Sequence, residues 1–426
     1  MSNAIQDQAM DDAIAAPETY ADENRFQGIF ARLRAEDPVH WTAPQDFRPF
    51  WSVTRHADIL EIERQNDRFL NEPRTTLLSM RMEADLAAMW GGPDPKTGRV
   101  EPFRTLVHMD NPDHRAYRGL TQAWFMPPNL KKLEARMAEL ARRYVDRMME
   151  LGPECDFARD IAMHYPLHVI MSILGVPESD EAFMLKLTQE LFGGLDPDLQ
   201  RKSSDPLSNT ILDFFMYFKK ITEERRAHPT EDLSSVIANG TLKGCPLGDI
   251  ETASYYIIVA TAGHDTTSSS IAGGLRALVE NPGELAKLKA NPDLLPGAVD
   301  EMIRWATPVQ HFMRTATEDY ELRGRKIEKG QALCLWYVSG NRDEEVYPDP
   351  HRFRVDRDTN RHVAFGYGAH LCLGQHLAKM EIRALFKELL ERLDSIELAG
   401  QPRNSQAVFV RGLKTLPVRY AIRAAA

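Results

Sequence analysis

Apolar residues recur at helical spacing in several long stretches of the chain. In residues 131–151 these positions are Leu133, Met137, Leu140, Tyr144 and Met148, as on one face of a helix. Residues 250–280 predict a second helix, which Asp249 can cap and Asn281-Pro282 can end. At ~45 Å it is long enough to cross a whole domain. Residues 374–393 predict a third helix with an apolar inner stripe.

Patterns typical of β-strands are fewer. Residues 50–54 form a short aromatic and β-branched run, and residues 312–336 predict several short strands with turns at Gly324 and Gly330. The fold class is therefore expected to be mainly α with a small, mostly antiparallel β region. The chain has no internal repeat and no Gly/Ser linker. We expect one domain over residues 20–426 after a flexible N-terminal segment, residues 1–19.

Composition narrows the function classes. With 426 residues, 43% of them hydrophobic, the chain can bury a large core. The formal net charge of −10 argues against general nucleic-acid binding, which needs a basic face. No apolar run approaches the ~20 residues that cross a bilayer, so no membrane association is expected. The polar N-terminus does not resemble a signal peptide, and a cytoplasmic location is expected.

The chain has four cysteines, with no CxxC pair and no zinc-like spacing. Such scattered cysteines fit a reducing compartment. Cys155, Cys245 and Cys334 are interpreted as small buried hydrophobic residues.

Cys372 stands apart because three glycines surround it in Phe365–Gly374, FGYGAHLCLG, just before an amphipathic helix. A glycine-rich loop and a helix start can direct free amides and a favourable dipole at the sulfur. These stabilise a thiolate and make it a good metal ligand. A nucleotide-binding loop is an alternative, but Leu371 occupies the third glycine position of GxGxxG. The other alternative is a buried structural cysteine.

This segment resembles the haem-binding signature of the cytochrome P450 family, and the resemblance extends over nearly the whole chain. It implies the cytochrome P450 fold and haem b as the cofactor, with Cys372 as the axial iron ligand. Phe365 would pack near the sulfur, and Gly366 and Gly374 would belong to the same haem-binding loop.

Small residues, an acid and a hydroxyl follow one another within the long predicted helix, in Ala262-Gly263-His264-Asp265-Thr266. Asp and Thr there compete for backbone hydrogen bonds, and a solvated turn with a chance Asp-Thr pair is one interpretation. The resemblance implies another. Ala262 and Gly263 would leave space for the cofactor, Thr266 would hydrogen-bond dioxygen, and Asp265 would relay protons. His264 is expected to be packed or solvated.

Glu301 and Arg304 are three residues apart in a helical run and so lie on one face. They could be an ordinary surface pair, which would stabilise the fold little. The resemblance instead implies the ExxR motif, a buried network on the sulfur side of haem. Arg352, in the segment YPDPHRF, would complete that network by resemblance.

A haem site needs cations at the edge that holds the two propionates, and arginine pairs well with carboxylates. The candidates, placed by resemblance, are His114, Arg118, Arg314 and His370. Each of them alone could equally be a surface charge.

The resemblance to soluble bacterial members implies a monomeric monooxygenase that hydroxylates a compact hydrophobic substrate, either a terpenoid or an aromatic or alicyclic hydrocarbon. Electrons would come from an iron–sulfur ferredoxin with a separate reductase, docked on a patch containing Arg115, Arg118 and Lys379. Residues 74–107, with no clear helix, and residues 183–218 would cover the substrate. The alternatives are a hydroxylase of steroids or fatty acids, a peroxide-dependent peroxygenase and a haem-based gas sensor.

Overall fold

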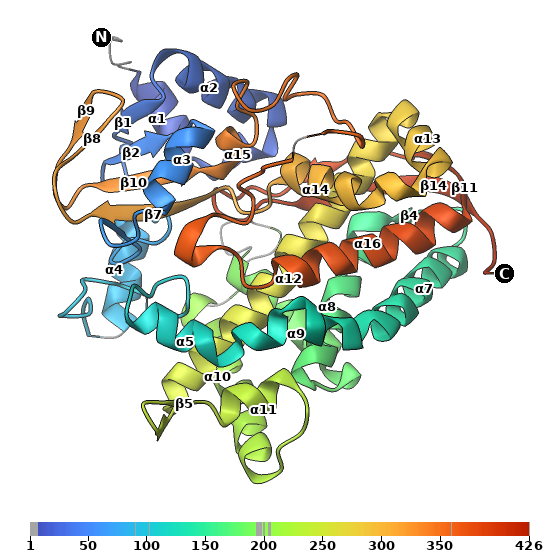
Figure 1. Ribbon diagram of the computed structural model, residues 1–426, viewed down its shortest axis with the longest axis horizontal. Helices are drawn as coiled ribbons and strands as arrows, with labels where there is room; N and C mark the ends of the chain where they lie inside the picture. Colours follow the sequence, from blue (N-terminus) through green and yellow to red (C-terminus); the bar gives the residue numbers. More distant parts are fainter. Residues whose placement is uncertain are drawn as a thin grey trace.

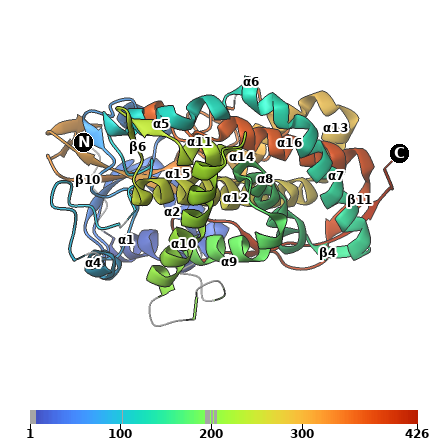
Figure 2. The same ribbon diagram turned by 90° about the horizontal axis from the view of Figure 1, so that it is seen from below.

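The computed structural model describes residues 7–89, 91–101, 103–192, 198, 201–202, 206–358 and 360–425. Helices make up most of the molecule (Figure 1). The five-stranded sheet lies on the side of the N-terminus and the three-stranded sheet of β4, β11 and β14 lies near the C-terminus, and α12 runs between them (Figure 2). The prediction of a mainly α fold with a small β region is confirmed.

The largest sheet has the strand order β1-β2-β10-β7-β3. Its strands are β1 (Val39–Thr42), β2 (Phe50–Val53), β3 (Phe69–Leu70), β7 (His311–Ala316) and β10 (Ala332–Trp336). Among the described strands, β2 and β10 pair in parallel and the other pairs are antiparallel. The smaller sheets use β4 (Glu154–Asp156), β5 (Thr241–Leu242), β6 (Cys245–Pro246), β8 (Tyr320–Leu322), β9 (Arg325–Ile327), β11 (Leu393–Leu398), β12 (Arg403–Asn404), β13 (Leu413–Thr415) and β14 (Pro417–Ile422).

Both predicted turns contain glycines in the left-handed region, Gly324 with φ +74° and Gly330 with φ +85°.

The α-helices are α1 (Gln8–Ala15), α2 (Glu23–Glu36), α3 (His56–Glu63), α4 (Met80–Met89), α5 (Asp113–Thr121), α6 (Pro127–Leu130), α7 (Glu134–Leu151), α8 (His164–Leu174), α9 (Glu181–Phe192), α10 (Pro206–Ala227), α11 (Leu233–Ala238), α12 (Asp249–Glu280), α13 (Pro282–Ala290), α14 (Leu295–Ala306), α15 (Tyr337–Gly340) and α16 (Gln375–Arg392).

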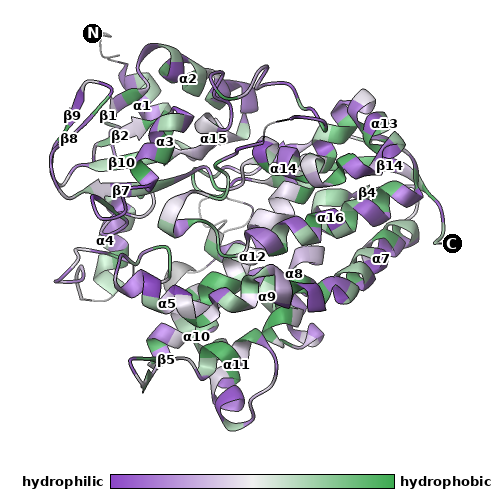
Figure 3. Ribbon diagram, viewed as in Figure 1, coloured by the Kyte–Doolittle hydropathy of each residue, from purple (hydrophilic) through white to green (hydrophobic). Residues whose placement is uncertain are grey.

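The three helices expected from periodicity are present as α7, α12 and α16. Along α7 hydrophobic and hydrophilic residues mix (Figure 3), and Met137, Leu140, Tyr144 and Met148 are buried as predicted. Two details differ. Gly248 caps α12 and Asp249 is already helical. The stretch 74–107, expected to have no clear helix, contains α4.

The central helix α12 packs closely against α14 because a glycine faces a methionine. A Cβ on Gly274 would lie 2.7 Å from Met302 Cγ, closer than real contacts allow. The buried Ile271 and Leu278 of the same helix belong to the main hydrophobic core. This close approach fixes α14, which carries Glu301 and Arg304, against the helix that carries Thr266.

The N-terminal segment, residues 1–19, which is expected to be flexible, contains α1, and Asp7 caps this helix by accepting a hydrogen bond from the Met10 amide. Ile14 and Ala15 are each 1% exposed and pack into the cluster around Trp336. Because the segment is mostly polar, its composition did not indicate that these few apolar residues are buried in a core. Residues 1–6 lie outside the described residues.

A buried histidine ties α1 and the end of α2 to β1. His40 Nε2 lies 2.7 Å from Asp11 Oδ1, and His40 Nδ1 lies 3.0 Å from Asp37 Oδ2. Burial disfavours the charged imidazole, but the hydrogen bonds and charges of Asp11 and Asp37 outweigh it and raise the pKa of His40 to about 9. His40 is therefore a cation at neutral pH.

This raised pKa predicts a pH-dependent stability. The stabilisation from protonated His40 is complete below its ordinary pKa of 6.5 and is lost as pH rises through about 9. Its upper limit is about 3 kcal/mol, from about 1.4 kcal/mol per unit of pKa. Thermal unfolding between pH 6 and pH 10 should show the wild type losing its advantage over His40→Gln across this window. Parallel curves for the two proteins would contradict the prediction.

The other cysteines differ in burial. Cys334 is buried and Cys155 partly buried, as expected, but Cys245 is exposed, which corrects its interpretation as a buried hydrophobic residue. It stands in the short hairpin β5–β6, where no core covers it.

Within the described part of the chain, no helix combines the length and apolar character needed to span a membrane.

Candidate functional site

The loop before α16 presents Cys372 to a cavity inside the molecule. The Cys372 amide donates to the Phe365 carbonyl at 2.9 Å, and the Gly366 amide donates to the Val363 carbonyl at 2.9 Å, so the loop folds back on itself. Gly366 and Gly368 have φ values of +66° and +68°, which glycine adopts without strain. The loop conformation thus explains two of the glycines that mark the sequence motif.

Several groups around the Cys372 sulfur stabilise its thiolate form, the form that binds a metal. Burial raises the pKa of the thiol, and the amides of Gly374 and Gln375 together with the charge of Arg118 oppose that rise. Gln375 is the first residue of α16, so the helix start supplies a donor as expected. A bound metal cation would add the remaining stabilisation of the thiolate. Phe365 also lines the cavity.

Helix α12 forms another part of the cavity wall. Ala262, Gly263 and Thr266 line it, and the Thr266 hydroxyl donates to the Ala262 carbonyl at 2.7 Å. A Cβ on Gly263 would lie 3.1 Å from Ile170 Cδ1, so the missing side chain also serves the packing of α12 on α8. The sequence-predicted Cys372 and Ala262–Thr266 segments therefore face one common space.

Asp265 is not at the cavity wall. Its side chain is largely buried, Oδ1 lies 3.5 Å from His264 Nδ1, and Oδ2 accepts no hydrogen bond from the described residues. Burial raises the pKa of Asp265, opposed by His264. His264 is buried, 3.0 Å from Thr188 Oγ1 and 2.6 Å from the Met163 carbonyl, which confirms its packed role.

Four predicted cofactor-binding residues converge on one edge of the cavity: His114, Arg118, Arg314 and His370. The rings of His114 and His370 lie 3.9 Å apart. Arg118 Nη2 donates to the Leu371 carbonyl at 2.7 Å, joining α5 to the cysteine loop. This edge offers two guanidinium groups and two imidazoles, which fits a group carrying carboxylates.

The two imidazoles are held neutral in the protein alone. Burial and the nearby Arg118 and Arg314 lower the pKa of His114 to about 4. Burial, followed by Arg314, His114 and Arg118, lowers the pKa of His370 to about 2. The positive charge at this edge therefore comes from Arg118 and Arg314, and it would stabilise a bound anionic group.

Sequence reasoning missed several polar residues that line the cavity, among them Asn71 and Tyr337, besides Ser270 and Glu381. Asn71 Nδ2 lies 3.3 Å from His370 Nδ1 and donates to the Val107 carbonyl at 2.6 Å. Tyr337, at the start of α15, lines the cavity beside Arg314. Neither Asn71 nor Tyr337 stands in a motif, and only the spatial meeting of β3, α15 and the cysteine loop brings them to the site.

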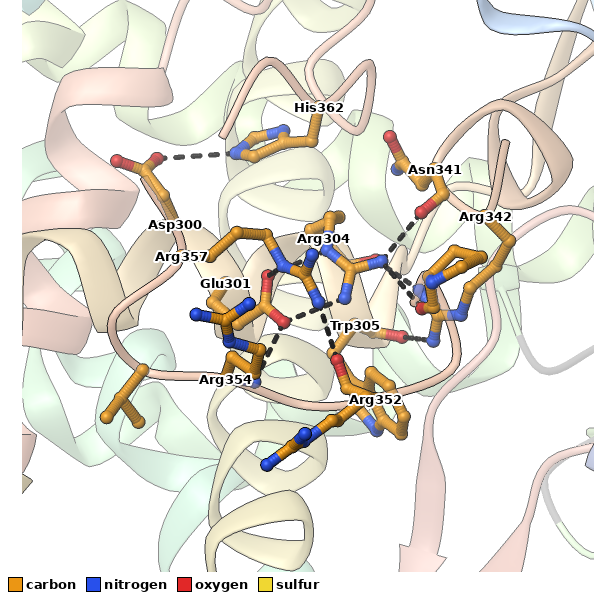
Figure 4. A network of polar contacts seen from close by, with 12 residues as sticks. Asp300, Glu301, Arg304, Trp305, Asn341, Arg342, Arg352, Arg354, Arg357 and His362 are labelled. Atoms are coloured by element: carbon orange, nitrogen blue, oxygen red, sulfur yellow. Dashed lines mark hydrogen bonds and ion pairs between the residues drawn. The ribbon is translucent and has the colours of Figure 1, made fainter. Parts of the chain in front are cut away.

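The ExxR pair forms a buried network, as predicted (Figure 4). Arg304 Nε and Nη2 each lie 2.7 Å from a carboxylate oxygen of Glu301, and both side chains are 0% exposed. Arg304 also donates to the Asn341 carbonyl at 2.7 Å. The Asn341 side chain in turn accepts from the Val363 amide at 2.7 Å, so the network supports the start of the cysteine loop.

The second arginine of this network is Arg357, not the predicted Arg352. Arg357 Nε donates to Glu301 Oε2 at 3.0 Å, whereas Arg352 is exposed and contributes its backbone carbonyl to Arg357 (Figure 4). Asp349, with φ +51°, adopts a left-handed conformation three residues before Arg352, and its backbone carbonyl accepts a hydrogen bond from Arg357 at 3.4 Å. The position of Arg352 in the segment YPDPHRF therefore predicted the wrong arginine for this network.

The rest of the cavity wall is mainly apolar. Its described apolar side chains include Leu106, Val107, Phe125, Ile170, Ile258, Val259, Val309 and Phe312. The predicted covering segment 74–107 contributes its last two residues. No described residue of 183–218 is part of the wall. Phe214 is 0% exposed and stacks with Phe218 at 6.2 Å, as a core residue does. Part of that segment lies outside the described residues.

Comparisons with known proteins agree with this geometry. Residues 96–420 match the family described as Cytochrome P450. The chain is 43% identical to cytochrome P450-terp of Pseudomonas sp, over 96% of each chain. It is 34% identical to linalool 8-monooxygenase of Pseudomonas putida, over 92% of this chain and 94% of that one. The crystal structure of CYP108D1 from Novosphingobium aromaticivorans superposes with a TM-score of 0.91 at 43% identity, covering 99% of this chain and 100% of that one.

Proposed function

Because the chain belongs to the cytochrome P450 family, and so is a monooxygenase that binds haem b through a cysteine thiolate, we propose that Cys372 is this ligand and that the enzyme hydroxylates a compact terpenoid or a similar hydrocarbon. The single observation that carries the proposal is the cavity itself. Its wall combines Cys372, the α12 residues Ala262, Gly263 and Thr266, and the two arginines Arg118 and Arg314.

Haem, when bound, supplies the iron chemistry that uses dioxygen, two electrons and two protons to convert a C–H bond into C–OH with release of one water. The chain supplies the surroundings. Cys372 donates electron density from a sulfur that the Gly374 and Gln375 amides stabilise. Arg118, Arg314 and the two imidazoles of His114 and His370 would hold the propionates.

Thr266 is the hydroxyl that we propose to take part in proton delivery. Its Oγ1 donates to the Ala262 carbonyl, which leaves the oxygen lone pairs as acceptors at the cavity wall. Asp265 would supply protons from its buried position behind this wall, where the raised pKa makes it easier to hold a proton. The relay requires the Asp265 side chain to reach a hydroxyl or a water on the cavity side.

The apolar wall supports the choice of substrate class. One turn before Ala262, α12 presents Ile258 and Val259, and Val309 and Phe312 lie on the segment that enters β7. Such a wall binds hydrocarbon mainly by removing it from water, at about 25 cal/mol per Å² of apolar surface. The likeness to a linalool 8-monooxygenase also favours a terpenoid alcohol.

Optical titration of the holoenzyme tests the substrate class. Monoterpene alcohols and monocyclic hydrocarbons should give a saturable shift of the main haem band, whereas a steroid and a long-chain fatty acid should give none. Product formation with dioxygen, a ferredoxin, its reductase and reduced nicotinamide should follow the same order. Saturable binding by the steroid or the fatty acid alone would overturn the terpenoid proposal, and turnover with hydrogen peroxide alone would favour a peroxygenase.

The proposed electron donor is an acidic iron–sulfur ferredoxin that docks over the cysteine loop. Arg115 is exposed on α5, and Lys379 on α16 pairs with Asp300 at 2.6 Å with 36% of its side chain exposed. Arg115→Glu should slow reduction by the ferredoxin and weaken its salt dependence. Lys326→Glu, on the distant hairpin β8–β9, is the matched control. Equal reduction rates in both variants would contradict this docking site.

A further inference from the structure

A buried carboxylate, Glu63, lies behind the arginine at the cofactor edge of the cavity. Glu63 is the last residue of α3 and is 3% exposed. Its Oε1 accepts from Arg314 Nη2 at 2.9 Å and from the Tyr337 hydroxyl at 2.5 Å. Arg314 and Tyr337 both line the cavity, whereas Glu63 does not. The acid therefore reaches the site through its two partners.

The cysteine loop also packs against Glu63. A Cβ on Gly366 would lie 3.5 Å from both Glu63 Oε1 and the Tyr337 hydroxyl oxygen. A Cβ on Gly368 would lie 2.3 Å from the Glu63 backbone carbonyl, which no other residue type could tolerate without a shift of the loop. Glu63 thus contacts the two loop glycines through both its side chain and its main chain.

The charges at this edge make the position of Glu63 consequential. Arg314 has one guanidinium nitrogen on the Met313 carbonyl and another on Glu63, so the acid fixes its orientation and shares its positive charge. A haem brings two propionates to an edge with Arg118 and Arg314. Glu63 adds a third carboxylate to these two cations. Burial raises the pKa of Glu63, but Arg314 and the Tyr337 hydroxyl oppose that rise and favour the carboxylate. A buried negative charge at the edge that would hold the haem would stabilise the oxidised iron, because that state carries the more positive charge.

We propose that Glu63 is a positioning residue that holds Arg314 toward the haem propionates and lowers the reduction potential of the haem through its buried charge. The inference rests on the proposed placement of the propionates beside Arg314. Glu63 acts through Arg314 and the cysteine loop and touches neither substrate nor iron. The same contacts explain why a polar, motif-free position at the end of α3 carries an acid.

Potentiometric titration of the substrate-free holoenzyme tests this inference. Glu63→Gln should shift the midpoint potential to more positive values, and Glu63→Asp should restore most of the wild-type potential. Asp58→Asn is the matched control, because Asp58 is a 4% exposed acid of the same helix that pairs with Arg323 at 2.6 Å and does not line the cavity. A shift in Glu63→Gln no larger than that of Asp58→Asn overturns the proposal.

A second variant, Tyr337→Phe, tests the proposal if Glu63→Gln does not retain haem. Tyr337→Phe keeps the carboxylate but removes one of its donors, so the charge is less compensated and the potential should move to more negative values. An unchanged potential in that variant overturns the proposal.

The rate of haem transfer to apomyoglobin separates this inference from the placement on which it rests. Arg314→Gln should lose haem faster than the wild type. If its rate is unchanged, the propionate placement fails and the role of Glu63 fails with it. If Arg314→Gln loses haem faster while Glu63→Gln keeps the wild-type potential, only the inference about Glu63 is overturned.

Discussion

Replacing Glu301 by glutamine is expected to destabilise the fold by about 3–5 kcal/mol, the usual effect of removing one partner from a buried ion pair. Glu301 is 0% exposed and accepts from Arg304 at 2.7 Å twice, from Arg357 at 3.0 Å and from the Arg354 amide at 3.1 Å. Glutamine leaves two guanidinium groups without a counter-charge. Since domains are stable by only about 5–15 kcal/mol, little haem-loaded protein should remain.

Thermal unfolding together with haem content per chain measures this effect. The matched control is Glu139→Gln, because Glu139 pairs with Arg136 at 3.0 Å with the same three-residue spacing on the exposed face of α7. Exposed pairs contribute about 0–1 kcal/mol, so this variant should resemble the wild type. If both variants unfolded alike with full haem content, the network would have no role in supporting the cysteine loop.

Thr266→Ala is expected to keep haem and substrate binding but to divert reducing equivalents from product to hydrogen peroxide. Thr266 lines the same cavity as Cys372, and its hydroxyl is the group that we assign to proton delivery. Product formation should fall by up to about 10²-fold, the lower end of what a positioned proton-transfer group contributes. Consumption of reduced nicotinamide should fall much less.

Two further threonine variants separate chemistry from packing. Thr266→Ser keeps the hydroxyl and should remain largely coupled. Thr261→Ala removes a threonine from the same helix that makes the same kind of bond, to the Ile257 carbonyl at 2.7 Å, but is buried away from the cavity. Normal coupling in Thr266→Ala, or equal uncoupling in Thr261→Ala, would exclude Thr266 from proton delivery.

Local sequence patterns predicted the parts of the molecule that local physics decides. The spacing of Met137, Leu140 and Tyr144 defines a buried face whatever that face packs against. The glycines around Cys372 signal a loop that only glycine can form. These features need no knowledge of distant segments, so α7, α12, α16 and the cysteine loop followed from the sequence.

Features that depend on long-range packing did not follow. Arg352 and Arg357 have the same chemistry, and only the folded path of the chain decides that Arg357 is the one that reaches Glu301. Glu63 and Asn71 join the site because α3 and β3 happen to lie beside the cysteine loop in the fold. No pattern within a short window could indicate these meetings.

The expected substrate cover shows the same limit. Residues 183–218 are rich in aromatic side chains, which suit a lid and a core equally well. In the fold Phe218 stacks on Tyr256 of α12 with ring centroids 4.8 Å apart, which makes this part of the segment core. The cavity wall instead draws on Phe125 and Phe312, which stand in segments with no distinguishing pattern.

The claim on which the account depends is that Cys372 binds the haem iron as a thiolate. The absorption spectrum of the reduced carbon monoxide complex tests it most directly. The wild type and Cys155→Ser, which changes a partly buried cysteine away from the cavity, should both show the thiolate-type band. Cys372→Ser should lose or shift that band. Its persistence in Cys372→Ser would contradict the account.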